Sequence, residues 1–190
     1  ANIPYEINSF SDLLKDPKQT ITFNFSKNDK IEKLVEIIGE DAKMHLTIDK
    51  NVYHVNLYEK FLVLILAKIS NLIPQGGIWL NTQRPEWNDA NNSLVGYGLS
   101  MVSVCYLRRF LVYLSDIISY SNSKKINISV DVFNWFNDLN TSLCKYEYIL
   151  DEKNSFSSKQ RMDFIKDAGL SFSKYRSKIY IDGFIKKTKI

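Results

Sequence analysis

The sequence predicts a mainly α-helical fold in which successive helices form antiparallel hairpins. Apolar residues recur at helical spacing along most of the chain, as at Ile31, Leu34, Val35 and Ile38. The segments with this pattern are joined by short connections, which favour antiparallel neighbours. Segments that alternate between apolar and polar residues, as strands do, are few and short. We therefore expect tandem helical hairpins with one small β-hairpin.

Length and charge limit the kind of protein that this chain can be. Its 190 residues are enough for one domain with a hydrophobic core, and we expect a single helical domain over residues 1–190. The net charge of +4 is small and the basic residues are scattered, so we expect no nucleic-acid partner. The longest apolar run, Phe61–Ala67, is far shorter than the roughly 18 residues that a membrane span needs.

The first elements that the sequence predicts are a short strand and a helix. Apolar and polar residues alternate in Ile21–Phe25, which is typical of a strand. A helix follows over Lys27–Ile38, with Ser26 as its N-cap and Gly39 at its C-terminal end.

A hairpin and an apolar helix come next. Residues 44–55 alternate around a turn at Asp49–Asn51, which predicts a small β-hairpin. Tyr58–Ile73 form a helix with an almost wholly apolar middle, so we expect it to be buried on most sides. Pro74 ends this helix, because proline cannot continue it.

The longest predicted helix is Leu99–Tyr120. Its polar residues gather on one face and leave most of its surface apolar, so we expect it to pack against several neighbours. Cys105 falls in this helix and Cys144 in the next, both within apolar helical patterns. Free cysteines in such patterns are usually buried, and we expect both thiols to be buried.

Two further helices are predicted over residues 129–150 and 157–177, after a polar linker at 121–128. Residues of N-cap type stand at Ser129 or Asp131 and at Ser157 or Ser158. Gly169 lies inside the second helix and is expected to weaken it, because glycine is a poor helix former. Residues 179–184 are expected to be extended.

The segment Gly76–Gly98 carries the residues that are most suggestive of function. It lies between the two most apolar helices, yet it holds two of the three tryptophans and four of the seven glycines. Loops on a rigid scaffold are where binding and catalytic sites are often built. Flat indole faces, amide and guanidinium donors and nearby carboxylates are what a sugar ligand needs. The segment is therefore a candidate carbohydrate site.

The candidate sugar-binding residues offer an apolar face or a hydrogen-bonding group, and are Trp79, Gln83, Arg84, Trp87, Asn88, Asn91 and Asn92. Glu86 and Asp89 are candidate catalytic carboxylates, three positions apart. Four of these candidates also have a structural reading: Trp79 and Trp87 can pack beneath the loop, Arg84 can form an ion pair with Glu86 or Asp89, and Asp89 can cap a helix or an Asx turn.

The tripeptide Trp87-Asn88-Asp89, followed by Asn91 and by Val95-Gly96, resembles the Trp-Asn-Asp signature of cellobiose phosphorylase-type enzymes and related six-hairpin (α/α toroid) glycosidases. In that family the pattern Gly-Asp-Trp-Asn-Asp-Gly-Met-Asn precedes Val-Gly and a long apolar helix. Here Glu86 replaces the aspartate and Ala90 replaces the second glycine. The resemblance implies that Asp89 protonates the leaving glycosidic oxygen, while Trp87 and Asn88 shape the acceptor side.

The reaction that this resemblance implies is inverting hydrolysis or phosphorolysis of an oligosaccharide or other glycan. An inverting hydrolase needs a second carboxylate about 6.5–9.5 Å from the acid, and a phosphorolytic enzyme needs a phosphate site. Glu86 is the first candidate for the second carboxylate, and Glu59 and Asp49 are weaker ones. A complete toroid has more helices than this sequence predicts. We therefore expect residues 1–190 to be part of a larger carbohydrate-active protein whose remaining domains are partners.

Two other readings stay open. The chain can be a non-catalytic helical domain whose loop binds a glycan or a partner protein, or a structural piece of a multidomain chain. His45 and His54 lie in the expected hairpin, and with only two cysteines they do not form the spacing of a zinc site. The sequence predicts neither a metal nor a cofactor.

Overall fold

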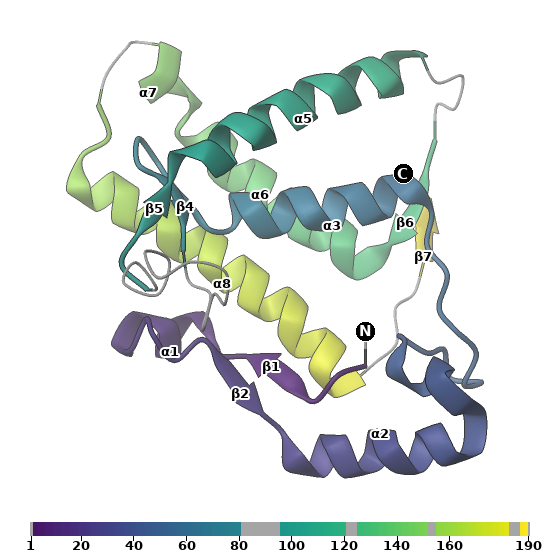
Figure 1. Cartoon of the computed structure of the whole chain (residues 1–190). Coiled ribbons are helices and arrows are strands. Elements are labelled where there is room, and N and C mark those ends of the chain that lie inside the picture. Colours follow the sequence, from purple (N-terminus) through teal and green to yellow (C-terminus); the bar gives the residue numbers. More distant parts are fainter. Residues whose placement is uncertain (1, 81–95, 121–124, 152–154, 183–186, 190) are drawn as a thin grey trace.

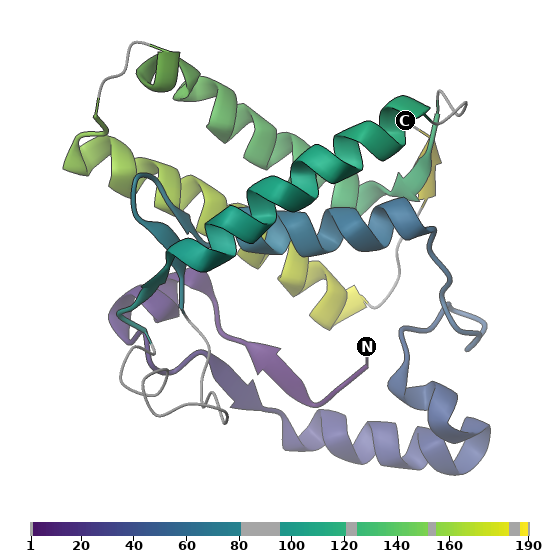
Figure 2. The same ribbon diagram turned by 45° about the horizontal axis from the view of Figure 1, so that its top comes forward.

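Helices make up most of the computed structural model, which describes residues 2–80, 96–120, 125–151, 155–182 and 187–189. The predicted mainly α class is therefore confirmed. The helices are α1 (Phe10–Lys15), α2 (Phe25–Ile38), α3 (Leu57–Ile69), α5 (Met101–Tyr120), α6 (Val130–Lys145), α7 (Glu147–Asp151) and α8 (Ser158–Asp182), with a 3₁₀ helix η1 (Gly39–Lys43). The longer helices α3, α5, α6 and α8 run in alternating directions, as expected for helical hairpins (Figures 1 and 2).

Short antiparallel strands tie the ends of the helices together. The strands are β1 (Tyr5–Ile7), β2 (Ile21–Phe23), β3 (Leu72–Ile73), β4 (Gly77–Trp79), β5 (Leu99–Ser100), β6 (Asn127–Ser129) and β7 (Lys187–Lys189). They pair as β1–β2, as β3–β4–β5 and as β6–β7. The last pair joins the middle of the chain to its C-terminal end.

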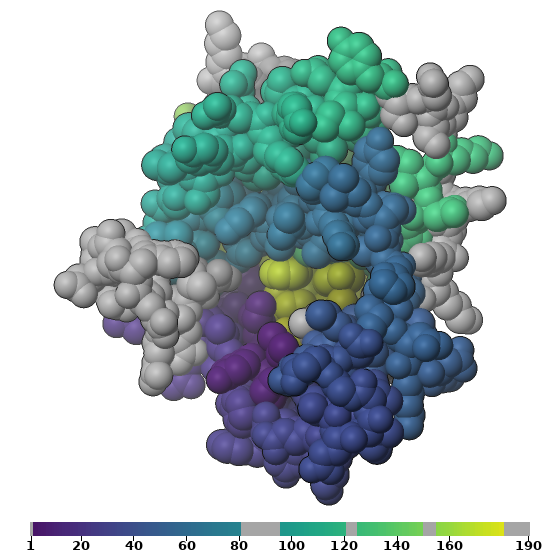
Figure 3. All heavy atoms as spheres, turned by 45° about the vertical axis from the view of Figure 1, so that its right-hand side comes forward, coloured from purple at the N-terminus to yellow at the C-terminus, as the bar shows by residue number. Residues whose placement is uncertain are grey.

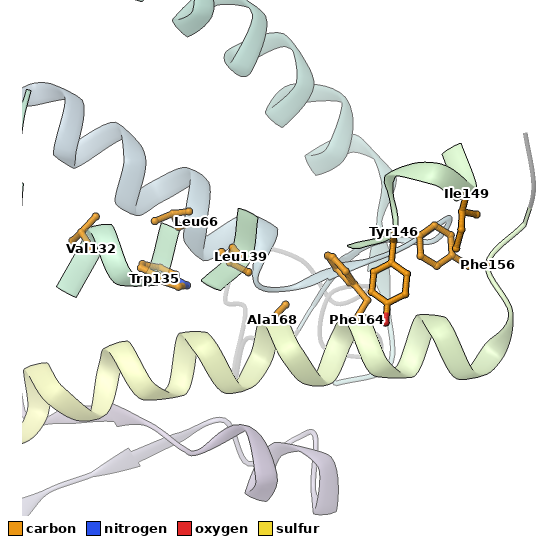
Figure 4. Close-up of a cluster of buried hydrophobic side chains, with 9 residues drawn as sticks. All are labelled: Leu66, Val132, Trp135, Leu139, Tyr146, Ile149, Phe156, Phe164 and Ala168. Carbon is orange, nitrogen blue, oxygen red and sulfur yellow. The ribbon is translucent and has the colours of Figure 1, made fainter. Parts of the chain in front are cut away.

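The hydrophobic core lies where α3, α6 and α8 meet (Figure 4). Trp135 of α6 is 1% exposed, and its ring is stacked on those of Phe172 and Tyr175 in α8, with centroid distances of 4.8 and 4.4 Å. Its indole N–H donates to Ser70 Oγ over 3.1 Å. The other buried members of this cluster are Leu66, Val132, Leu139, Tyr146, Ile149, Phe156, Phe164 and Ala168.

The N-terminal elements pack on the opposite side of α8 from α6 (Figure 1). Phe10 of α1 covers Gly169 of α8 so closely that a Cβ added to Gly169 would lie 2.2 Å from the Phe10 ring. Gly169 was expected to weaken this helix; it instead allows two elements to approach each other.

Several predicted boundaries were wrong near the start of the chain. Helix α2 begins at Phe25 because its N-cap is Asn24, whose side chain accepts from Lys27 N, and not Ser26. Gly39 does end α2, with a φ of 74°. The expected hairpin at 44–55 is reduced to a single bridge between Leu46 and Val52.

Later boundaries also differ from those predicted. The apolar helix ends at Ile69, and residues 72 and 73 instead form strand β3 beside β4. A residue that precedes a proline favours extended backbone, which is consistent with Ile73 lying in β3 before Pro74. Helix α8 continues through residues 179–182, which were expected to be extended, and the polar linker at 121–128 contains part of β6.

Burial was predicted less well than secondary structure. Both Cys105 and Cys144 are exposed, although their apolar surroundings in the sequence predicted burial. Helix α3 was expected to be buried on most sides, but Leu64 is 63% exposed. Leu64 lines pockets between α3 and its neighbours, where its side chain keeps contact with solvent.

Candidate functional site

The predicted functional segment Gly76–Gly98 is described only at its two ends, residues 76–80 and 96–98. Trp79 lies in the described part. The other candidates lie outside the described residues, and these are Gln83, Arg84, Glu86, Trp87, Asn88, Asp89, Asn91 and Asn92.

The two ends of this segment are joined in a hydrogen-bonded stem. Strand β4 pairs with β5, with Trp79 opposite Leu99. Beyond that pair, Leu80 N donates to Gly98 O over 2.9 Å and Gly96 N donates to Leu80 O over 2.8 Å. The chain therefore leaves the sheet at Leu80 and returns to it at Gly96.

Trp79 forms hydrogen bonds in the stem with both its side chain and its backbone. Its indole Nε1–H donates to Gly96 O over 3.0 Å, and its backbone N–H donates to Asn71 O over 2.7 Å. The ring is half-buried. Because the indole donor is engaged in the stem, what Trp79 can offer to a ligand is its aromatic face.

The stem also rests on the N-terminal elements. Gly96 has a φ of 80°, and an added Cβ would lie 2.6 Å from Pro17 O. The left-handed backbone and the close contact both require glycine at this position. Beside it, Lys18 Nζ lies 5.4 Å from the centroid of the exposed Tyr97 ring.

The long helix that was expected after the segment is present as α5. Strand β5 leads directly into it, and Ser100 Oγ accepts from Ser103 N over 3.1 Å in its first turn. In chain order, the candidate segment begins with β4 and is followed by the short strand β5 and the long helix α5.

A second polar cluster surrounds Glu59, one of the weaker candidates for the second carboxylate, at the start of α3. Glu59 is 2% exposed, and its carboxylate accepts from the backbone N–H of Ser129 over 3.2 Å and from the Ser129 hydroxyl. The Tyr53 hydroxyl lies 3.0 Å from Ser129 Oγ. Ser129 is the N-cap residue of α6, so the carboxylate also lies at the positive end of that helix dipole.

This cluster forms one wall of a pocket of about 380 Å³ between α3, α8 and residues 45–55. In Figure 3 the yellow end of α8 lies at the bottom of a hollow between α3 and the N-terminal elements. The pocket is lined by His45, Tyr53, Val55, Glu59, Lys60, Val63, Leu64, Tyr175 and Ile179.

Burial shifts the pKa values of two ring groups of this pocket, His45 and Tyr175, toward their neutral forms. Desolvation lowers the pKa of His45, and desolvation followed by the nearby charges of Glu59 and Asp131 raises the pKa of Tyr175. His45 Nε2 is buried and has no hydrogen-bond partner among the described residues. At neutral pH both rings are therefore uncharged, and the carboxylate of Glu59 is bonded within the fold.

Glu59 is far from the stem of the candidate segment. Ten residues of helix separate it from Ile69, or about 15 Å at the rise of an α-helix. Its hydrogen bonds to Ser129 join α3 to α6, which accounts for its burial. Asp49, the other weaker candidate, is exposed in the turn before Lys50.

The sequence contained a weak signal for Glu59. Asn56 and Glu59 have the spacing of an N-cap and a residue of the first turn, and the Asn56 side chain does accept from Glu59 N. Such a pattern indicates a helix start. It does not reveal that the carboxylate is buried, because its partner Ser129 is 70 positions away.

No group of three or more histidine, cysteine, aspartate or glutamate residues within the described ranges is placed to hold a metal ion. Among the described helices, none has both the length and the apolar character to cross a membrane.

Comparison with known proteins found no family model that matches this chain and no matching curated protein.

Proposed function

We propose that this chain is a carbohydrate-active protein, or part of one, that acts on glycosidic bonds through the segment Gly76–Gly98. The observation that carries the proposal is the sequence Trp87-Asn88-Asp89 with Asn91 and Val95-Gly96 behind it. This sequence stands directly before a long apolar helix, as it does in the six-hairpin glycosidases that it resembles.

The described stem supports this proposal. The hydrogen bonds between Leu80, Gly96 and Gly98 fix the two ends of the segment on a small sheet. The half-buried Trp79 is the last residue of β4, the central strand of that sheet. A fixed base of this kind is what a loop needs if it is to present several side chains to one ligand.

In the proposed reaction Asp89 is a general acid. Its carboxylic acid donates a proton to the glycosidic oxygen as the bond from that oxygen to the anomeric carbon breaks. In the same displacement, water that gives up a proton to a base, or inorganic phosphate, forms the new bond at the anomeric carbon on the opposite face of the sugar. Glu86 is the candidate base for the water reaction.

The remaining candidates bind the sugar. Trp79 and Trp87 stack on its C–H faces, because sugar rings have apolar faces that aromatic side chains cover well. The hydroxyl groups are bound by side chains with amide or guanidinium donors, which are Gln83, Arg84, Asn88, Asn91 and Asn92.

The test is the release of product from a panel of oligosaccharides, with and without inorganic phosphate. We expect Asp89→Asn to lower turnover by about 10²–10⁴-fold, the usual contribution of a general acid. The loss should be smaller for aryl glycosides, whose leaving groups need less protonation. Asp29→Asn, at an exposed position on α2, is the matched control and should leave turnover unchanged. Full activity of Asp89→Asn would show that Asp89 is not the acid.

A non-catalytic binding module is the second candidate function. It is favoured by Glu59, a candidate for the second carboxylate, which is buried and bonded to Ser129 within the fold. Glycan binding without turnover, abolished by Trp87→Ala but unaffected by Asp89→Asn, would support that reading over the enzymatic one. Binding of neither glycan nor substrate would contradict both forms of the carbohydrate proposal.

A further inference from the structure

Helix α5 has a second apolar face that no other described element covers. Its inward face packs toward α3, where Phe110 meets Phe61 with a centroid distance of 5.3 Å, and Leu114 is buried. A stripe of exposed side chains lies about a third of a turn away from this inward face. The α5 stripe consists of Val102, Cys105, Arg109, Val112, Tyr113, Asp116 and Tyr120. Tyr106 stands at its border, where it also lines a pocket toward Leu64 and Lys68 of α3.

The α5 stripe is too apolar for an ordinary solvent-facing surface. Val102 is 66% exposed, Tyr113 is 61% exposed and Tyr120 is 89% exposed. The polar residues Arg108, Ser115 and Ser119 lie beside the stripe on another part of the exposed helix surface, together with the exposed Met101. An exposed apolar stripe rimmed by polar residues marks an interaction surface.

The α5 stripe contains two charged residues, Arg109 and Asp116, and their positions indicate which surface could pair with it. Arg109 and Asp116 are seven residues apart, or about 10.5 Å along the helix, too far to pair with each other. Neither forms a salt bridge with any other residue in the part of the chain that the structure describes. Arg109 lies instead 5.7 Å from the centroid of the Tyr106 ring.

A second α5 helix, laid antiparallel on the first, would satisfy both charges at once. A two-fold axis between Val112 and Tyr113 places Arg109 of each copy opposite Asp116 of the other. The same symmetry places Cys105 opposite Tyr120 and brings Val112 and Tyr113 together at the centre. A self-complementary patch of this kind is what a two-fold interface requires.

We propose that the α5 stripe is a homodimer interface in which two copies of this chain pair their α5 helices antiparallel. This proposal is independent of the carbohydrate function. One helix pair gives a small interface, so association should depend on protein concentration.

The first test is the mass of the chain in sedimentation velocity as concentration rises. We expect a mass approaching twice the 22.1 kDa of one chain, returning to 22.1 kDa on dilution. A single species of 22.1 kDa at all concentrations up to about 100 µM, where even weak complexes form, would overturn the proposal.

A charge swap tests the geometry. Arg109→Glu alone, or Asp116→Arg alone, places like charges opposite each other twice in each dimer and should weaken association at least tenfold. The double variant Arg109→Glu/Asp116→Arg exchanges the positions of the positive and negative charges. Opposite charges then face each other again in both pairs, and the dimer should be recovered. Arg108→Glu is the matched control beside the α5 stripe and should have no effect. An Arg109→Glu variant that behaves like Arg108→Glu would contradict the proposed interface.

The exposed cysteines give an independent readout of the same interface. Dimerisation should slow the alkylation of Cys105, which lies in the α5 stripe, as protein concentration rises. Cys144 is also exposed but lies on α6, so its alkylation rate should stay constant. Equal behaviour of the two thiols in a dimeric sample would place the interface elsewhere and overturn the proposal.

Discussion

Gly169 shows that packing can outweigh helix propensity at one residue. It lies within α8, where alanine would ordinarily favour the helix by about 1 kcal/mol. Phe10 fills the space that a Cβ would need, because three atoms of its ring are within 2.6 Å of the added atom. Phe10 is 4% exposed, and its backbone N–H donates to Ser173 Oγ over 2.8 Å, so it cannot move away freely.

We therefore expect Gly169→Ala to lower the free energy of unfolding by about 1–3 kcal/mol, the usual cost of overpacking. Urea unfolding followed by tryptophan fluorescence measures this. In a Phe10→Ala background the same substitution should become neutral or stabilising, because the obstructing ring is gone. A Gly169→Ala variant that is more stable than the native chain would contradict the close packing of α1 on α8.

His45 gives the protein a pH-dependent stability. Burial lowers its pKa in the folded state below the value of about 6.5 that it has when unfolded. Between those two values the unfolded chain binds more protons, so protonation favours unfolding. The stabilising effect of neutral His45 is present above about pH 6.5 and is lost as the pH falls toward the folded pKa.

This dependence can be measured as the urea midpoint of unfolding at about pH 7.5 and about pH 5.5, on either side of the unfolded pKa. We expect His45→Gln to lose less stability between these two pH values than the native chain does. His54→Gln, at the exposed histidine, is the control for the substitution itself. An equal pH slope in the native chain and in His45→Gln would show that His45 does not titrate in this window.

At the scale of single elements, the residue at which a helix starts is determined most directly by side chains that cap its first backbone N–H groups. The sequence left Ser157 and Ser158 as alternative caps for α8. In the structure Ser157 Oγ accepts from Gln160 N over 3.2 Å, and Gln160 Oε1 accepts from Ser157 N over 2.9 Å. This reciprocal pair is a capping box.

Ser157→Ala should therefore cost about 1 kcal/mol of stability, the typical value for loss of an N-cap. Ser158→Ala changes the next residue, which is the first of the helix, and should change stability by less than half of that amount. Both values come from urea unfolding. Amide exchange should also quicken in the first turn of α8 for Ser157→Ala only, and equal effects of the two substitutions would contradict the assignment of the cap.

The helices were predictable because their signal is local. The spacing of apolar residues in α2, α5, α6 and α8 is a property of each segment alone. Strands β3, β6 and β7 are two or three residues long and exist because distant residues pair, as Ile128 does with Thr188. No pattern within such short segments distinguishes them from loops.

Burial was not predictable, because it depends on which elements cover a face. Cys105 and Leu64 carry the apolar signal of a core, yet both side chains are exposed in the described structure. For the candidate site, the glycines and aromatic residues of Gly76–Gly98 led to the prediction of a functional segment but did not predict the hydrogen-bonded stem at its two ends. Sequence reasoning also missed the pairing of Glu59 with Ser129, which joins residues 70 positions apart.

At the scale of the whole molecule, the described chain has a core around α3, α6 and α8 and an N-terminal part attached to one side of α8 (Figure 1). The attachment uses few contacts. Arg176 is 7% exposed, and its Nη2 donates to Asn8 O and to Ser173 Oγ, each over 3.1 Å. Tyr180 Oη accepts from Ile7 N over 3.0 Å, and Lys27 Nζ lies 5.2 Å from the centroid of the Tyr180 ring.

Helix α2 buries only Ile31, whereas α6 buries Val132, Trp135 and Leu139. Regions with few buried apolar contacts open at a lower free energy than the core does. In amide hydrogen exchange we therefore expect the amides of β1, β2 and α2 to exchange well before those of α6 and α8. Equal protection throughout would show that the N-terminal part opens only when the whole molecule unfolds.

Arg176→Gln should widen the difference in amide exchange rate between the N-terminal elements and helices α6 and α8. The shorter side chain cannot reach Asn8 O, and leaving one buried hydrogen-bonding group unpaired costs about 1–3 kcal/mol. Exchange in β1, β2 and α2 should accelerate, while the slowest amides of α6 change much less. Lys174→Gln is the control on the same helix. Lys174 Nζ forms an ion pair with Asp138 of α6 over 3.5 Å, so this substitution removes a contact to α6 and not one to the N-terminal elements. Acceleration in α6 equal to that in α2 would mean that Arg176 supports the core itself and not the attachment of the N-terminal part.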